Sequence, residues 1–466
     1  MKFQAMRMFS MLRLLVVCFL LLLGNGVHLQ AQDDEPTAEP PTNTPIKHFL
    51  FLMQENHSFD NYFGTYPGAN GIPEGTCMPY DPNDESLGCV EPFRLGENDV
   101  EMDDPDHSEE THAVQYNDGL MNGFVYALER RSQDGRLAMG YYDGETLSYY
   151  WNIADEYVLF DNFFSSVHGG SFDNHMYWVA GQTVVANANE DMQVLLNNTP
   201  TIFDRLEEQG ISWKFYVQNY EPGLTYRTAS LYPMNRASQV IWVPLLNMDR
   251  FLDDPVLNSR IVNLDEYYDD LANGTLPSVA FLVPSGPSEH PPSNVVSGAR
   301  FVRSLLQRLI QSDYWESSAF LWSYDDWGGW YDHVPPPRVD EFGYGFRVPA
   351  LLVSSYARQG HIDSTLTDYT SALKFIQDNW NLEPLADRDA QANSIVSAFD
   401  FTQPPREAAF VPFERGEVET APSPRRDVIF IFYGMAIIAT VVVIVLAQLR
   451  SRKKQPTATD TPREEA

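Results

Sequence analysis

A carboxylate and a carboxamide stand side by side directly after the first apolar run that follows the N-terminal region. Glu55 and Asn56 follow Ile46–Met53, a run of strand length, and open the segment ENHSFDNYFG at 55–64. A buried strand fixes the backbone at its end, and ligands of open α/β sheets bind at the carboxyl edge of the strands. Two oxygen donors at such an edge suit a divalent cation and an anionic substrate. A surface turn is the alternative for so short a motif.

Two adjacent aspartates follow a second apolar strand. Asp325 and Asp326 follow the predicted strand Ala319–Ser323 with only Tyr324 between, and the glycine pair Gly328-Gly329 comes shortly after them. Two like charges at a buried strand end repel each other unless a cation holds them. The glycines permit close approach of backbone or ligand, and we expect His333, slightly further on, to contact substrate. A solvated acidic turn is the alternative, but it does not explain the strand and the flanking aromatic residues.

A serine stands where a helix is predicted to begin. The strand Tyr157–Phe160 is followed by a glycine pair, by Ser171 and by a helical pattern at Phe172–Gly181. Free N–H groups and the positive end of the helix favour a bound anion and a developing alkoxide at that position. An ordinary N-cap serine would occupy the same place, so the nucleophilic and the capping interpretations both stay open. Asn174, three residues later, is a candidate substrate contact.

Histidines in two loops extend the candidate set. His290 follows the strand Val279–Val283, and the two prolines after it restrict its backbone. His107 and His112 lie in a second loop region and could reach the site or merely be exposed.

Three strand ends therefore offer an oxygen-rich set of side chains. Carboxylates without nearby thiolates favour one hard divalent ion, Ca²⁺, Mg²⁺ or Mn²⁺, and the nearby histidines leave Zn²⁺ open. A metal beside a serine lowers the pKa of its hydroxyl and aligns it for in-line attack on phosphorus. The expected metal ligands are Glu55, Asn56, Ser171, Asp325 and Asp326.

Short apolar runs alternate with helical patterns along most of the chain. This alternation predicts an α/β fold, with a mostly parallel sheet covered on both faces. Residues 64–120 and 218–275 look loop-rich and are candidate insertions over the site. The predicted strands are 47–53, 157–160, 212–217, 279–283, 319–323 and 349–353, and the predicted helices include 172–181, 202–208, 299–311 and 368–380.

Both ends of the chain have apolar runs that predict a signal peptide and a membrane helix. Residues 1–31 have basic residues, then an apolar run, then a small residue, which is typical of a secretory signal peptide; a signal anchor is the alternative. Val428–Leu449 is an uncharged run of 22 residues followed at once by basic residues, which predicts a transmembrane helix with a cytoplasmic C-terminus. The expected order is signal peptide 1–31, leader 32–45, one catalytic domain 46–402, stalk 403–427, membrane helix 428–449 and cytoplasmic tail 450–466.

Charge and cysteine content agree with a domain outside the cytosol. The 466-residue chain has 64 acidic and 31 basic residues, a formal charge of −33, which argues against nucleic-acid binding. Cys18 would leave with the signal peptide. Cys77 and Cys89 remain, and such a pair in an exported protein predicts a disulfide, with two free thiols as the alternative.

Four motifs taken together resemble the bacterial phosphoesterase family, which includes phospholipases C and related acid phosphatases. They are ENHSFDNYFG at 55–64, DNFFSSVHGGSFDNHMYWVAGQ at 161–182, SEHPP at 288–292 and DDWGGWYDHVPPP at 325–337. The resemblance covers roughly residues 46–385. It implies an alkaline-phosphatase-like α/β/α sandwich and hydrolysis of phosphate esters.

The resemblance also implies roles for individual residues. Glu55 and Asn56 match the family's metal-binding pair, and Asp325 and Asp326 match its adjacent acidic ligands. Ser171 matches the nucleophile. His290 matches a histidine that contacts phosphate or protonates the leaving group, and His107 matches another phosphate-contacting histidine.

Departures from the family pattern bear on the substrate. The family often has Thr-Pro-Asn where this chain has Ser171-Phe172-Asp173-Asn174, and many members have a histidine where this chain has Asp368-Tyr369-Thr370. Serine and the short chain favour an acid-phosphatase-like enzyme that works through a phosphoserine. A phospholipase C acting on lipid head groups is the alternative, since a membrane anchor brings lipid within reach. A non-catalytic surface binding protein is the third, although every expected site position is filled.

Overall fold

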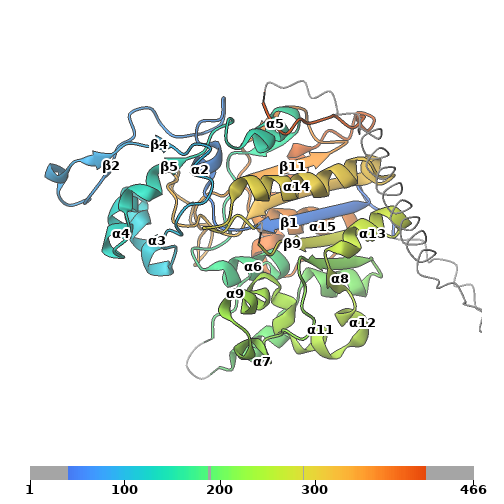
Figure 1. Ribbon diagram of the computed structural model, residues 1–466. Helices are drawn as coiled ribbons and strands as arrows, with labels where there is room; N and C mark the ends of the chain where they lie inside the picture. Colours follow the sequence, from blue (N-terminus) through green and yellow to red (C-terminus); the bar gives the residue numbers. More distant parts are fainter. Residues whose placement is uncertain (1–39, 187–189, 287, 416–466) are drawn as a thin grey trace, which may run out of the picture.

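The computed structural model describes residues 40–186, 190–286 and 288–415 (Figure 1). Its centre is an eight-stranded sheet of order β12-β6-β11-β10-β1-β9-β7-β8. β11 pairs antiparallel with β10 and β6, and the other neighbouring strands are parallel. The strands are β1 His48–Gln54, β6 Val158–Phe160, β7 Trp213–Val217, β8 Ile261–Asn263, β9 Val279–Val283, β10 Ser318–Tyr324, β11 Ala350–Ser354 and β12 His361–Asp363.

Helices connect these strands and form the segments inserted between them. The longest are α14, α15 and α6. The helices are α2 Phe59–Phe63, α3 Glu109–Tyr116, α4 Phe124–Arg130, α5 Ser148–Glu156, α6 Ser171–Ala180, α7 Met192–Asn198, α8 Ile202–Glu208, α9 Met234–Ala237, α10 Gln239–Trp242, α11 Asp249–Asp253, α12 Pro255–Asn258, α13 Asp265–Asn273, α14 Val295–Ile310, α15 Tyr369–Trp380 and α16 Asp387–Gln391.

Two helical layers enclose the sheet. On one face α14 contacts α5 and α13, and on the other α15 contacts α6, which contacts α8. Phe51 of β1 packs edge-on against Trp178 of α6. On the opposite face Trp322 of β10 packs against Tyr150 of α5. The expected α/β/α sandwich with a mostly parallel sheet is therefore confirmed.

The sequence of each element explains its place. All seven residues of β1 are buried, as a central parallel strand covered on both faces requires. In α14 the buried residues recur at helical spacing, for example Val302, Leu305 and Leu309, which gives the helix one apolar face for the sheet. Asn294 caps this helix by accepting a hydrogen bond from the backbone N–H of Ser297.

Two edge strands escaped the sequence prediction. β8 and β12 have three residues each, too few for a recognisable alternation of apolar and polar residues. The two loop-rich segments contain short helices and turns. Figure 1 shows α3, from the first segment, and α4, just after it, on the side toward which the β1 arrow points. The first insertion thus lies on the side of the sheet where the site was expected.

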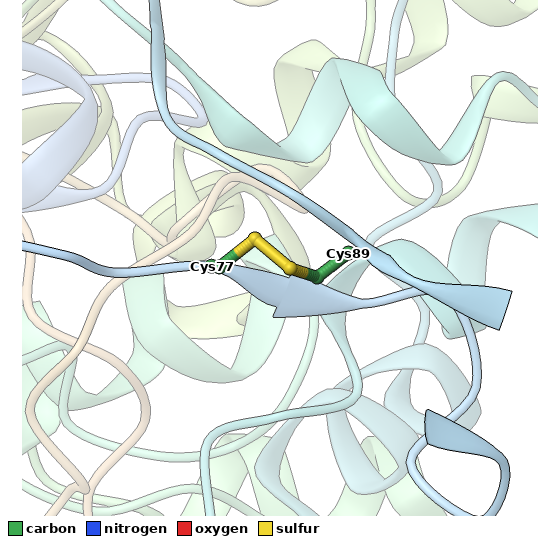
Figure 2. Close-up of a disulfide and its surroundings, with 2 residues drawn as sticks. All are labelled: Cys77 and Cys89. Atoms are coloured by element: carbon green, nitrogen blue, oxygen red, sulfur yellow. A yellow bond between two sulfur atoms is a disulfide. The ribbon is translucent and has the colours of Figure 1, made fainter. Parts of the chain in front are cut away.

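The predicted disulfide is present within this first insertion. Cys77 and Cys89 are bonded, and their Cα atoms are 5.4 Å apart. Figure 2 shows the bond beside the two short strands β2 (Met78–Pro79) and β3 (Cys89–Val90), which pair antiparallel. The bond therefore fixes the base of a short loop on the surface of the insertion.

The packed region extends beyond the predicted domain boundaries at 46 and 402. Asn43 donates a backbone hydrogen bond to the carbonyl of Asn379, 2.8 Å away. After residue 402, Arg406 forms an ion pair with Glu156 at 2.8 Å, and the ring of Phe413 stacks on Tyr149. The proline and charge content of 403–426 suggested a stalk, but individual side chains hold its first part against the domain.

Within the described residues, no helix is both long and apolar enough to cross a membrane. The predicted signal peptide and the predicted membrane helix at 428–449 fall outside those residues. Both remain predictions.

Candidate active site

The ends of β1 and β10 bring the two predicted ligand pairs together. These strands are parallel neighbours, and their last residues, Gln54 and Tyr324, are partners in the register. The next residues therefore emerge side by side. The backbone N–H of Asp325 donates to the carbonyl of Gln54 at 3.0 Å, and that of Asn56 donates to Asp325 Oδ1 at 3.0 Å. Glu55, Asn56, Asp325 and Asp326 are at most 2% exposed.

Each of these four side chains has a buried oxygen atom without a hydrogen-bond partner among the described residues. These atoms are Glu55 Oε2, Asn56 Oδ1, Asp325 Oδ2 and Asp326 Oδ2. Burial, and after it the charges of the two aspartates, raises the pKa of Glu55 well above its ordinary value. Burial and the charge of Asp325 do the same for Asp326. Unpartnered buried oxygens and crowded carboxylates are what a bound cation would satisfy, so these residues fit the expected divalent metal.

His175 joins this cluster and was missed in the sequence. Its Nε2 lies 3.4 Å from Glu55 Oε1, and Glu55, His175 and Asp325 each offer a potential ligand atom within 4.8 Å of the others. Burial lowers the pKa of His175 to about 4, so the ring is neutral and able to bind a metal. The sequence did offer a signal for including His175, because it stands one helical turn after the candidate nucleophile Ser171.

Ser171 is the first residue of α6. Gly170 occupies the N-cap position, and no side chain caps the helix, so the capping interpretation of Ser171 is wrong. The hydroxyl lies at the positive end of a ten-residue helix. His175 stands four residues later, and residues at that spacing share a helix face with Cβ atoms about 5–6 Å apart. Ser171 thus shares a helix face with His175, the residue that lies beside Glu55.

Asn174 faces a different way. Its Oδ1 accepts from the backbone N–H of Val167 at 3.1 Å, and its Nδ2 donates to the carbonyls of Val167 and Gly169, each at 3.3 Å. These bonds hold the turn that leads into Ser171. Asn174 therefore supports the turn before Ser171, and its expected contact with substrate stays a prediction.

His107 contacts Asn56. Its Nδ1 lies 2.9 Å from the carbonyl of Pro105 and its Nε2 lies 2.9 Å from Asn56 Nδ2. Because a carbonyl only accepts, Nδ1 carries the proton and Nε2 accepts from the amide. This contact uses the amide nitrogen of Asn56, while Oδ1 has no hydrogen-bond partner among the described residues. A second constraint comes from Gly328, where an added Cβ would lie 2.1 Å from the carbonyl oxygen of Asn56.

His290 lies beside His107, with ring centroids 5.6 Å apart. His290 Nδ1 is 2.8 Å from the carbonyl of Pro291, so this nitrogen also donates its proton. The other nitrogen, Nε2, is then the atom available to a substrate.

His112 is buried, its Nε2 has no hydrogen-bond partner among the described residues, and burial lowers its pKa to about 3.

His333 belongs to a separate polar cluster. Its Nδ1 lies 2.7 Å from Asp60 Oδ2, and its Nε2 lies 3.2 Å from Asn70 Oδ1. The guanidinium of Arg347, fully buried, pairs with Asp60 at 3.1 Å and with Asp332 at 2.9 Å. Both ring nitrogens of His333 are thus engaged away from the predicted metal ligands, and its role at the substrate stays a prediction.

Comparison with known proteins agrees with this geometry. The sequence profile of the Phosphoesterase family matches residues 46–383. The chain belongs to the Phosphoesterase family. Among curated proteins, this family member is 30% identical over 415 residues to phospholipase C A of Mycobacterium tuberculosis (strain CDC 1551 / Oshkosh), covering 78% of each chain. It is 25% identical over 426 residues to the non-hemolytic phospholipase C of Pseudomonas aeruginosa, covering 78% of this chain and 58% of the other.

This phosphoesterase is a hydrolase that acts on phosphate ester bonds. Among solved structures, a protein in the alkaline phosphatase superfamily from Vibrio parahaemolyticus is 13% identical, with 74% of this chain and 71% of that chain covered and a TM-score of 0.33. A TM-score this low carries no weight of its own. The α/β/α architecture rests on the sheet order and the helical layers.

Proposed function

We propose that this phosphoesterase hydrolyses phosphate esters through a phosphoserine at Ser171, with one divalent cation held by Glu55, Asn56, Asp325 and Asp326. The single observation that carries this proposal is the set of four unpartnered, buried oxygens at the ends of β1 and β10. α6 begins with a serine and contributes His175 to the same cluster. A cation bound there would lower the pKa of the serine hydroxyl and offset charge on the phosphate.

The residues of the chain then have distinct tasks. The Ser171 hydroxyl loses its proton to solvent, Ser171 Oγ attacks phosphorus, the bond from phosphorus to the leaving oxygen breaks, and the phosphoryl group is transferred to the serine. Ser171 Oγ takes a proton back from solvent when the phosphoserine is hydrolysed. The first N–H groups of α6 are free to donate to phosphate oxygens. His290, protonated at Nε2, would give its proton to the leaving oxygen and then accept one from the attacking water. That water releases the phosphate product and restores the serine.

The relatives bear on which ester is cleaved. Those named above carry the name phospholipase C, which supports a phosphodiester of lipid type as the substrate. The acid-phosphatase interpretation, based on Ser171 and chain length, stays a prediction. The two differ in whether the phosphorus carries a second ester group. Phosphatidylcholine would yield diacylglycerol and phosphocholine, whereas a monoester would yield an alcohol and phosphate.

The test compares Ser171→Ala with Ser171→Thr, using p-nitrophenyl phosphate, p-nitrophenyl phosphorylcholine and phosphatidylcholine vesicles. Without its oxygen nucleophile, the alanine variant should lose at least about 10³-fold in kcat on every ester that the wild-type protein cleaves. The threonine variant keeps a hydroxyl and should retain part of the activity. An alanine variant with wild-type rates would refute the proposal. The preferred ester separates phospholipase C from acid phosphatase.

A further inference from the structure

A buried carboxylate with no role in the chemistry above lies directly behind the site. Glu289 is fully buried. Its Oε1 accepts from Gln54 Nε2 at 2.9 Å and from the hydroxyl of Tyr150, and its Oε2 accepts from the hydroxyls of Tyr62, at 2.5 Å, and Tyr324, at 2.8 Å. No lysine or arginine of the described residues forms an ion pair with it. Four neutral donors therefore satisfy this carboxylate.

The positions of two donors in the sequence connect the carboxylate to the site. Gln54 directly precedes Glu55 at the end of β1, and Tyr324 directly precedes Asp325 at the end of β10. Glu289 itself directly precedes His290. One side chain thus ties together three segments, each through the residue next to a proposed functional one.

Backbone contacts strengthen the same connection. The carbonyl of Ser288 accepts from the N–H of Glu55 at 3.0 Å. The carbonyl of Glu289 lies 3.0 Å from His57 Nε2, and His57 follows Asn56. The loop that carries His290 is therefore bonded to Glu55, the first member of the predicted ligand pair, and to His57, the residue after the pair.

The cost of this arrangement argues against a simple space-filling role. Glu289 has a φ of +71°, a left-handed conformation that is unfavourable for a residue with a side chain. α14 packs tightly against it, since an added Cβ on Gly298 would lie 2.1 Å from its Cγ and Oε1. Burial raises the pKa of Glu289 to about 7. An apolar side chain at this position would fill the space without the cost of burying a carboxylate.

We propose that Glu289 is a positioning residue, which holds the His290 loop in register with the ends of β1 and β10 so that His290 Nε2 faces the leaving oxygen. This inference rests on the proposed function, because it assumes that His290 is the proton donor. It assigns to Glu289 no contact with substrate or metal.

The test uses leaving groups of different basicity. Phenolate is a more basic leaving group than p-nitrophenolate, so its departure depends more strongly on a proton donor. A misplaced proton donor therefore slows hydrolysis of the phenyl phosphate ester more than that of the p-nitrophenyl phosphate ester. In the full-length protein, Glu289→Gln keeps the shape and removes the charge. We expect its kcat to fall at least tenfold more on the phenyl ester than on the p-nitrophenyl ester. Tyr150→Phe, which removes one donor, should show the same selectivity to a smaller degree.

Two other variants serve as controls. Asp270→Asn alters another buried carboxylate that accepts from a tyrosine hydroxyl, Tyr216 at 2.6 Å, and should show no leaving-group selectivity. His290→Ala should show the full selectivity. If Glu289→Gln and Tyr150→Phe slow both esters equally or neither, while His290→Ala is selective, the positioning role is overturned and the proton donor stands. A His290→Ala protein without leaving-group selectivity would overturn both the proton-donor role of His290 and the positioning role of Glu289. The loss of activity in Ser171→Ala tests the nucleophile separately.

Discussion

At the scale of single residues, the candidate site is defined by buried oxygen atoms that have no hydrogen-bond partner among the described residues. Three carboxylates and a carboxamide are buried together, and each has an unpartnered oxygen. Repulsion among them destabilises the metal-free fold, because the charged forms are forced together away from water. A cation would reverse the sign of this contribution. Removing one charge should therefore have opposite effects on the metal-free and the metal-bound protein.

Asp326→Asn tests that reversal. The variant keeps the size of the side chain and removes one buried charge, so the metal-free protein should gain about 1–3 kcal/mol in free energy of unfolding at neutral pH. Its affinity for the cation should fall at least about 10–100-fold. Denaturant unfolding with and without added metal measures both quantities. A metal-free variant less stable than the metal-free wild type would contradict the prediction.

Glu289 gives a prediction about pH. Its pKa rises from 4.5 in its ordinary state to about 7 when buried. The unfolded chain therefore loses this proton first as pH rises. Stability contributed by the protonated group is complete below about pH 4.5, falls as pH rises toward 7 and is then level, a change on the order of 3 kcal/mol. The difference between wild type and Glu289→Gln in unfolding experiments should follow that curve, and a pH-independent difference would contradict it.

At the scale of elements, two parallel strands and one helix position the site. β1 and β10 end in register, so their following residues meet without any long connection. α6 supplies both Ser171 and His175 from one face. The turn after β10 then passes very close to the turn after β1, at Gly328. The backbone there is held by contact between loops rather than by the sheet.

Gly328→Ala tests this close contact. Its φ is +62°, and an added Cβ would lie 2.1 Å from the carbonyl oxygen of Asn56. The variant should lose more than about 1–3 kcal/mol in stability, with a loss of activity because Asn56 must shift. Gly210→Ala is the matched control, since Gly210 has a φ of +66° but no atom within 4 Å of an added Cβ. Thermal unfolding that gave equal losses for both variants would show that the contact does not matter.

The sequence predicts elements with strong apolar runs and fails where the decisive contacts are tertiary. β9 and α8 have the predicted bounds, and the two ligand pairs meet as the strand ends require. His175 was missed because its neighbour Glu55 is 120 positions away in the chain. The motif also did not show that the ring nitrogens of His333 contact Asp60 and Asn70, and its expected contact with substrate stays a prediction. No local pattern shows that Glu289 has four donors from three distant segments.

At the scale of the whole molecule, the folded region is bounded by two segments with predicted targeting roles. The disulfide between Cys77 and Cys89 is consistent with a domain outside the cytosol. The predicted membrane helix at 428–449 and its predicted cytoplasmic flank lie outside the described residues, and this topology stays a prediction.

This topology can be measured in cells that produce the full-length protein. The chain should stay with the membrane fraction after alkaline extraction, because an uncharged run of 22 residues is long enough to span the bilayer. Protease added outside the cytosol should remove the catalytic region and leave the C-terminal tail protected. Recovery of the chain in the soluble fraction, or a tail that is digested first, would contradict the prediction.

The most direct measurement is the metal content of the purified protein together with its phosphoesterase activity before and after chelation. We predict about one divalent cation per chain, loss of activity as the cation is removed, and recovery when Ca²⁺, Mg²⁺, Mn²⁺ or Zn²⁺ is returned. Full activity in protein shown to contain no metal would contradict the assignment of the buried oxygens to a cation, and with it the proposed role of Ser171 beside that cation.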